Sequence, residues 1–220
     1  DSDLGSDDFG FMDWRDGTVA GVFARVFRIS FTGELSYEIN VSADYGRHVW
    51  EKLIEAGTEF DITPYGTESM HVLRAEKGFI IVGQDTDGSM TPADMNMDWV
   101  VGKNKAFSFI GKRSLQRSDS VRENRKQLVG PKTLNPTSVL PEGSQIVNDP
   151  TQAIPMAMQG HVTSSYYSAN MGYSIALAVV KGGLNRMGDT VHCPAADGSV
   201  IAAEIVSSVF YDPKGERQNV

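Results

Sequence analysis

A carboxylate and an aromatic ring lie close together in one short stretch of the chain. Glu38 follows Phe31 by seven residues and falls on the polar face of an alternating strand pattern, Ser36–Val41. Two carboxylate oxygens can accept hydrogen bonds from an amino group and an adjacent ring N–H, while an aromatic side chain stacks on the ring. This pair therefore suits a planar heterocycle, although a strand-surface carboxylate is more often simply solvated.

Other kinds of chemistry lack the residues that they need. The four histidines form no H-E-x-x-H motif, and the sequence has no C-x-x-C motif, so we expect no metal site. The single Cys193 lies in an apolar strand pattern, which favours a buried, inert thiol over a nucleophile. The pairs Gly102-Lys103 and Gly111-Lys112 lack the upstream glycine of a P-loop, and no G-x-G-x-x-G follows a strand.

The elements around Phe31 and Glu38 predict a β-hairpin. Val19–Ser30 is rich in Val, Phe and Ile and predicts one strand, Phe31–Glu34 a turn, and Ser36–Val41 the second strand. The first 17 residues are acidic and glycine-rich, so we expect a solvated surface segment or a frayed end there.

Two helices follow the hairpin. Ser42 is a plausible N-cap for a helix that Gly57 ends, and Thr67 for one that ends near Gly78. The apolar run 79–82 predicts a short buried strand. Strands and helices in this order are typical of an α+β fold.

The second half of the chain predicts an all-β domain. From Gln127 onward, short apolar strands alternate with Pro, Asn and Gly turn signals, which indicates a small barrel or sandwich. Residues 101–130 carry eight basic and two acidic residues, a net charge of +6; a solvated loop explains this better than an acidic partner surface. We expect domains at 1–118 and 127–220, with a linker at 119–126.

Composition limits the class of protein. The 220 residues carry a net charge of −8, 40% hydrophobic residues and 22% charged residues, which is ordinary globular composition. A pI near 5.0 argues against nucleic-acid binding. No apolar run could cross a membrane, and a single cysteine favours a reducing, cytoplasmic compartment.

Several motifs resemble one family. The run R-I-S-F-T-G-E-L-S-Y-E from Arg28 to Glu38 resembles the R-x-x-[YF]-T-G-E-x-[GS]-[YF]-E segment of folate-binding aminomethyltransferases, the glycine cleavage T-protein family. Further motifs similar to those of the family are L-R-A-E-K-G (73–78), G-Q-D (83–85), M-D-W (97–99), F-I-G-K (109–112) and M-G-Y (171–173). The resemblance implies a partial folate-binding domain followed by a C-terminal β-barrel.

One branch of the family is more similar still. The runs His71–Gly78, Val82–Gly88 and Phe210–Val220 resemble the C-terminal part of the α subunits of heterotetrameric sarcosine oxidases. That implies tetrahydrofolate at this region, a flavin-bearing β subunit as partner, and FAD, FMN and NAD held outside this chain. The reaction implied is transfer of the one-carbon unit of oxidised sarcosine to tetrahydrofolate, which yields glycine and 5,10-methylenetetrahydrofolate.

The resemblance also assigns roles to residues. Glu38 would accept hydrogen bonds from the pterin edge, and Phe31 would stack where the family usually has Tyr. Trp99 matches a position near the folate, with core packing equally plausible. Met70 stands where the family often has an Arg that meets folate. Tyr211 and Arg217 are the nearest candidates for a C-terminal folate-facing residue, and for Arg74 and Glu76 a structural ion pair is as plausible as ligand contact.

The resemblance leaves one role unfilled. The family's catalytic aspartate is expected upstream of residue 1, so we expect these residues to be inactive alone and a free sheet edge to favour self-association. Two alternatives stay open. One is another folate-dependent aminomethyltransferase or a dimethylglycine-oxidising enzyme, and the other is a non-catalytic folate-binding or assembly module.

Overall fold

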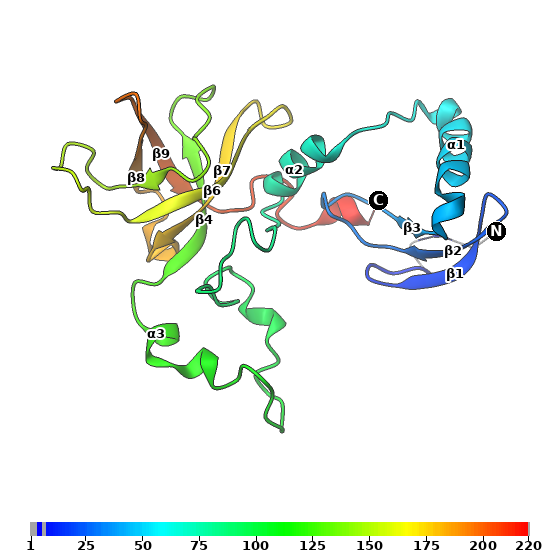
Figure 1. Cartoon of the computed structure of the whole chain (residues 1–220), viewed down its shortest axis with the longest axis horizontal. Coiled ribbons are helices and arrows are strands. Elements are labelled where there is room, and N and C mark those ends of the chain that lie inside the picture. The colour runs from blue at the N-terminus through cyan, green and yellow to red at the C-terminus, as the bar shows by residue number, and fades with distance from the viewer. Residues whose placement is uncertain (1–3, 6–7, 220) are drawn as a thin grey trace. The chain divides into compact units, whose positions relative to one another are not determined.

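A computed structural model describes residues 4–5 and 8–219 (Figure 1). Contacts within the chain divide it into two compact units. Unit 1 comprises Asp1–Arg74 with Asp212–Val220, and unit 2 comprises Ala75–Tyr211. None of the described helices is both long and apolar enough to cross a membrane.

Unit 1 is built on a three-stranded antiparallel sheet in the order β1-β2-β3. Its strands are β1 (Trp14–Val19), β2 (Val22–Phe27) and β3 (Glu38–Asn40). Ala20 and Gly21 both have positive φ, as the two central residues of a tight hairpin turn require. The pairing of β2 with β3, with Phe27 opposite Glu38, confirms the predicted hairpin, although β3 is shorter than expected.

The expectation for the acidic N-terminal residues was wrong over Trp14–Gly17. These residues form the larger part of β1 instead of a frayed end. Arg25 on β2 explains the difference, since it forms an ion pair with Asp16 at 2.7 Å and lies over the Trp14 ring at 4.2 Å. Cross-strand pairs of this kind stabilise a sheet and offset the local acidity.

Helices follow β3 as the capping and apolar pattern predicts. A short 3₁₀ helix (Ala43–Tyr45) leads into α1 (Gly46–Gly57), another (Thr58–Phe60) follows it, and α2 spans Thr67–Glu76. Helix α1 lies beside the sheet of unit 1 (Figure 1), and its buried residue is Val49. The Ser42 side chain makes no capping hydrogen bond, so only the position of the helix start is confirmed.

Residues 77–121 of unit 2 are largely irregular. Their first part packs on the barrel, where Met95 joins a core cluster with Leu128, and the part that leads into α3 extends away from the barrel (Figure 1). Only short helices occur in them, the 3₁₀ turns Asp98–Val100 and Ser114–Gln116 and the single turn α3 (Ser118–Val121). The predicted strand at 79–82 was wrong. Ile80 packs against a core cluster while Val82 is 83% exposed, so the apolar run supplies isolated contacts rather than a paired strand.

The rest of unit 2 is a closed β-barrel. Its sheet has the order β5-β6-β7-β4-β9-β8. The bridge between Val147 and His192, with both N–H···O distances at 2.9 Å, brings the β5 end of the sheet to β8. The predicted small barrel is therefore confirmed. Its strands are β4 (Lys126–Thr133), β5 (Gln145–Ile146), β6 (Gly160–Ser168), β7 (Tyr173–Lys181), β8 (Thr190–Pro194) and β9 (Val200–Val206).

The division by contacts differs from the expected domain boundary at 119–126. The contacts divide the chain between Arg74 and Ala75, within the last turn of α2, because Glu76 and the residues after it pack on the barrel. The expected linker begins within α3 and ends where β4 begins.

Candidate functional site

The loop between β2 and β3 carries the T-G-E sequence and the candidate aromatic ring. Phe31 is 44% exposed at the start of this loop. Gly33 has a φ of +81°, which favours glycine, and its N–H donates to Ser30 Oγ at 2.8 Å. The loop therefore has a defined turn and presents an aromatic side chain to solvent.

Glu38 begins β3 directly after the loop. Its side chain is exposed, as the alternation predicts, and Asn40 Nδ2 donates to its Oε1 at 2.9 Å. The neighbouring amide fixes one oxygen of the carboxylate, so this group is presented in a defined orientation on the polar face of the strand. A carboxylate held in this way can accept two parallel hydrogen bonds from a ligand edge.

Met70 lies on α2 and is half-buried. Its thioether has no charge and only weak acceptor capacity, so it offers packing where an arginine would offer a fork of donors. Phe31, Glu38 and Met70 all belong to unit 1.

The other two candidates belong to unit 2. Trp99 lies in the 3₁₀ turn Asp98–Val100 and is 80% exposed, so the core-packing interpretation is not supported. Tyr211 is half-buried, and its backbone N–H donates to the carbonyl of Glu76 at 2.9 Å. Arg217, the remaining candidate, lies in unit 1 and pairs with Glu34 at 2.8 Å.

The buried carboxylates of the L-R-A-E-K-G and G-Q-D motifs bind barrel residues. Glu76 is 2% exposed and accepts hydrogen bonds from Ser168 Oγ at 2.6 Å and Asn170 Nδ2 at 2.8 Å. Asp85 Oδ1 accepts from Thr163 Oγ1 at 2.5 Å and Ser164 Oγ at 2.7 Å. Glu76 thus binds the barrel through hydrogen bonds, and its expected ion pair with Arg74 stays a prediction. The contacts of Asp85 are ones that the sequence did not reveal.

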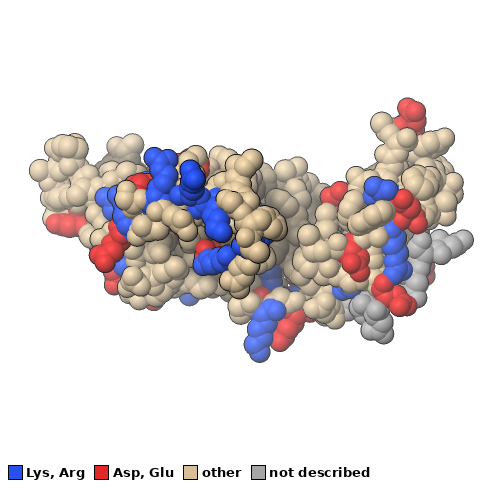
Figure 2. Space-filling model, turned by 90° about the horizontal axis from the view of Figure 1, so that it is seen from below, with Lys and Arg blue, Asp and Glu red and all other residues tan. Residues whose placement is uncertain are grey.

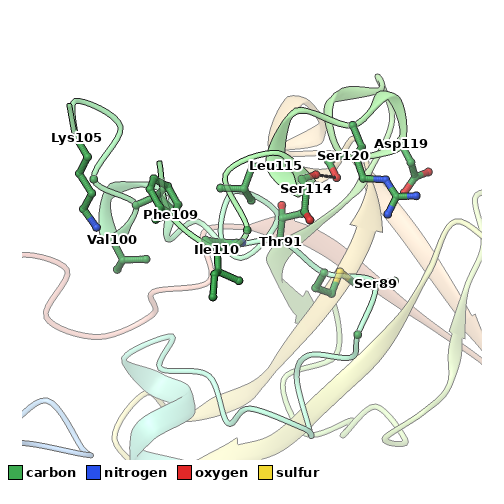
Figure 3. Close-up of a pocket in the computed structure, with 17 residues that line it drawn as sticks. Ser89, Thr91, Val100, Lys105, Phe109, Ile110, Ser114, Leu115, Asp119 and Ser120 are labelled. Carbon is green, nitrogen blue, oxygen red and sulfur yellow. Dashed lines mark hydrogen bonds between the residues drawn. The ribbon is translucent and has the colours of Figure 1, made fainter. Parts of the chain in front are cut away.

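A cavity of about 730 Å³ opens among the irregular residues of unit 2 (Figure 3). Phe109, Ile110 and Leu115 form part of its lining, with Lys105 at one side. The Ser120 hydroxyl donates to the carbonyl of Ser114 at 2.7 Å across the cavity wall. Basic side chains gather on the face of unit 2 seen from below in Figure 2. None of the candidate pterin residues lines this cavity.

Nucleophilic and metal chemistry find no support in the described part of the chain. Cys193 is fully buried, and this burial raises the pKa of its thiol to about 11. The adjacent His192 points outward, and Asn148 O lies 3.0 Å from its Nδ1. Among the residues that the structure describes, no group of three or more His, Cys, Asp or Glu side chains that could hold a metal occurs.

Two family models match the chain. The GCVT N-terminal domain matches residues 1–105, and the glycine cleavage T-protein C-terminal barrel domain matches residues 126–212. These matches confirm the resemblance found in the motifs and the two-part organisation of the fold.

Individual relatives agree with the family models. The chain is 47% identical over 220 residues to the sarcosine oxidase α subunit of Corynebacterium sp. (strain U-96), and 38% identical over 223 residues to that of Rhizobium meliloti. These alignments cover 99% and 100% of this chain but 22% of each relative, so the chain spans about a fifth of their length. It is also 33% identical over 180 residues to an aminomethyltransferase of Halothermothrix orenii, covering 82% of this chain and 48% of that protein.

A solved structure shows the same fold. The crystal structure of the glycine cleavage system aminomethyltransferase T from Bartonella henselae superposes with a TM-score of 0.78 at 22% identity. The match covers 94% of this chain and 54% of that one.

Proposed function

Because the chain belongs to the glycine cleavage T-protein family, we propose that its first unit holds the pterin ring of tetrahydrofolate. The protein would act as the folate-binding part of a sarcosine oxidase α subunit, the class of relative that is 47% identical over nearly the whole chain. The observation that carries the proposal is Glu38, an exposed carboxylate held by Asn40 directly after the loop that presents Phe31.

The two side chains fit a pterin in complementary ways. One oxygen of Glu38 is oriented by Asn40, and the carboxylate retains lone pairs for the amino group and ring N–H of the pyrimidine edge. Phe31 offers an apolar face for stacking and, unlike the Tyr usual in the family, no hydroxyl. Binding through this pair would orient the ring by both its edge and its face.

Met70 is the third proposed folate contact of unit 1. Trp99 and Tyr211 belong to unit 2 and are separate candidates for folate contact, Trp99 through an exposed aromatic surface and Tyr211 through a phenol. Met70 cannot form an ion pair with the glutamate tail of folate, so another residue must recognise that carboxylate. We infer that affinity in this chain depends more on the pterin and less on the tail.

The residues described contribute positioning rather than proton transfer. When bound, tetrahydrofolate supplies the nitrogen that takes up the one-carbon unit of oxidised sarcosine, leaving glycine and 5,10-methylenetetrahydrofolate. Glu38 and Phe31 would hold the ring at a fixed orientation, which lowers the entropic part of the barrier. The flavins and NAD would lie in other parts of the assembly, with a flavin-bearing subunit as the partner. We assign no general base to this chain and expect no sarcosine turnover by it alone.

Titration calorimetry with folinic acid tests the proposal. The wild-type chain should bind, and Glu38→Ala should weaken binding by at least tenfold, since buried donors of the ligand lose their acceptor. Glu51→Ala is the matched control, because Glu51 is an exposed carboxylate of unit 1 that pairs with Arg47 on α1. Equal affinity of wild type and Glu38→Ala would refute the site.

A second measurement separates the enzyme from its alternatives. Co-purification of the chain with a flavoprotein subunit would favour a sarcosine oxidase over a free-standing aminomethyltransferase. Folate-independent assembly with that subunit, without any folinic acid binding, would instead support an assembly module.

A further inference from the structure

The C-terminal tail lies against the loop that carries Phe31. Residues Asp212–Val220 belong to unit 1, although the barrel separates them from the rest of that unit in sequence. Arg217 Nε lies 2.9 and 2.8 Å from the two carboxylate oxygens of Glu34, so this one donor reaches both. A backbone hydrogen bond joins the same two segments, since Leu35 N–H donates to Arg217 O at 3.0 Å.

The tail has its own internal turn that orients Arg217. The Asp212 carboxylate accepts the N–H groups of Glu216 at 3.0 Å and Arg217 at 3.2 Å. This arrangement starts the 3₁₀ helix Glu216–Gln218 immediately after Gly215, whose φ of +69° favours glycine. Arg217 therefore belongs to a folded segment, so forming its ion pair with Glu34 costs less conformational entropy.

Arg28 ties the other end of the loop to the same tail. Arg28 is 2% exposed, and its guanidinium donates through Nη2 to Gln218 O at 2.7 Å and through Nη1 to Phe9 O at 2.5 Å. The loop thus has one anchor where it leaves β2, at Arg28, and a second at Glu34 and Leu35. Phe31 lies between the two anchors.

We propose that Glu34 and Arg217 are positioning residues for the pterin site. Their ion pair holds the β2–β3 loop so that Phe31 and Glu38 keep a fixed spacing before ligand arrives. A loop that is ordered in advance loses less conformational freedom on binding and therefore binds more tightly. The T-G-E glutamate then acts through the tail and does not contact the ligand. This inference rests on the function proposed above.

Charge reversal gives the sharpest test. Glu34→Gln and Arg217→Met should each weaken folinic acid binding by about fivefold, and the double variant Glu34→Arg with Arg217→Glu should return the Kd to within about twofold of wild type. Glu216→Gln is the matched control, since it removes a charge from the same tail at an exposed pair with Lys214 and leaves the loop contact intact. Its Kd should equal that of wild type.

Hydrogen exchange in the ligand-free chain provides a second readout. The Leu35 amide, which donates to Arg217 O, should exchange faster in both single variants and return to the wild-type rate in the charge-reversed pair. Weakened binding with rescue, together with this exchange pattern, supports the inference. Unchanged Kd values in the single variants, or a swap that restores exchange but not affinity, would overturn it.

Failure of the proposed function has a different signature. If wild type binds no folinic acid, or Glu38→Ala binds as wild type does, the pterin site itself is wrong and the positioning role falls with it. If Glu38→Ala weakens binding while the tail variants do not, only the positioning role of Glu34 and Arg217 is wrong.

Discussion

The carboxylate of Glu76 at the end of α2 accepts a hydrogen bond from the hydroxyl of Ser168 on β6, at 2.6 Å and across 92 positions of sequence. Asn170 Nδ2 donates to its second oxygen at 2.8 Å. The backbone carbonyl of Glu76 accepts hydrogen bonds from the N–H groups of Phe210 and Tyr211, both at 2.9 Å. Glu76 thus connects the end of α2 to the barrel and to the residues that follow β9.

Glu76→Gln should destabilise unit 2. The new amide must place an NH₂ group where one of the two donors, Ser168 or Asn170, now meets an oxygen, so one buried hydrogen bond is lost. We expect the free energy of unfolding to fall by about 2 kcal/mol, measured by hydrogen exchange in β6 and β7. Glu68→Gln, an exposed change on the same helix, should have almost no effect. Equal stabilities of the two variants would contradict the assignment.

Asp94 and Arg125 predict an acid-sensitive contact between residues 89–94 and the start of the barrel. Burial opposes ionisation of Asp94, but hydrogen bonds from Arg125 and from Thr91 outweigh it and hold its pKa below the ordinary 3.8. A carboxyl with a lowered pKa in the folded state stabilises the fold above its ordinary pKa, and this contribution is lost as pH falls through the folded value. Stability should therefore decline below about pH 4.

Asp94→Asn isolates this contribution. The side chains of Asp94 and Arg125 are 4% and 10% exposed, so removing the carboxylate leaves a buried guanidinium with less compensation. We expect the free energy of unfolding, measured by urea denaturation, to fall by about 3 kcal/mol at neutral pH. We also expect it to decline less steeply than in wild type as the pH is lowered. Asp98→Asn, which breaks the exposed pair with Lys103, should cost less than about 1 kcal/mol. If the free energy of unfolding of Asp94→Asn declined at acid pH as steeply as that of wild type, the prediction would be contradicted.

Cys193 should resist thiol reagents in the folded protein. Burial raises its pKa to about 11, so at pH 8 only about one thiol in a thousand is ionised, and the barrel wall blocks access. Ellman's reagent should react at once in guanidinium chloride and very slowly under native conditions. Rapid native reaction would show that β8 opens or that the thiol is not in the core.

Gly160 should not accept a side chain. A Cβ at this position on β6 would lie 2.1 Å from the carbonyl oxygen of Val179 on β7, and the backbone there cannot move without breaking the sheet. Gly160→Ala should therefore lower the thermal midpoint sharply, by an amount equivalent to about 3 kcal/mol or more. Gly198→Asn is a fair control, since this turn glycine has open space and asparagine tolerates a positive φ. A normal midpoint for Gly160→Ala would be inconsistent with this close approach.

Local patterns explain which parts of the fold could be predicted from sequence. Alternating apolar residues and turn signals predicted the individual barrel strands and the pairing of β2 with β3, because these depend on neighbours in sequence. The pairing of β4 with β7 and β9 joins residues far apart in sequence, and no local pattern specifies it. The larger part of β1 was missed because its acidity suggested a solvated end, whereas Arg25 on the next strand offsets Asp16. The run at 79–82 misled because four apolar residues do not reveal whether a partner strand exists.

The candidate site shows the same limit. Phe31 and Glu38 could be associated from sequence because one loop separates them. The pair Glu34–Arg217 spans 183 positions, and Asp85 reaches Thr163 across 78, so no local pattern could reveal either contact. The five folate candidates are divided between the two units, Phe31, Glu38 and Met70 in one and Trp99 and Tyr211 in the other.

The pterin edge contact of Glu38 is the central claim, and calorimetry with two ligands tests it most directly. Folinic acid carries the pterin, whereas 4-aminobenzoyl-glutamate has only the remainder of the molecule. Glu38→Gln should weaken folinic acid binding by about tenfold or more and leave the affinity for 4-aminobenzoyl-glutamate unchanged. Unchanged binding of folinic acid, or an equal loss for both ligands, would contradict the assignment of Glu38 to the pterin.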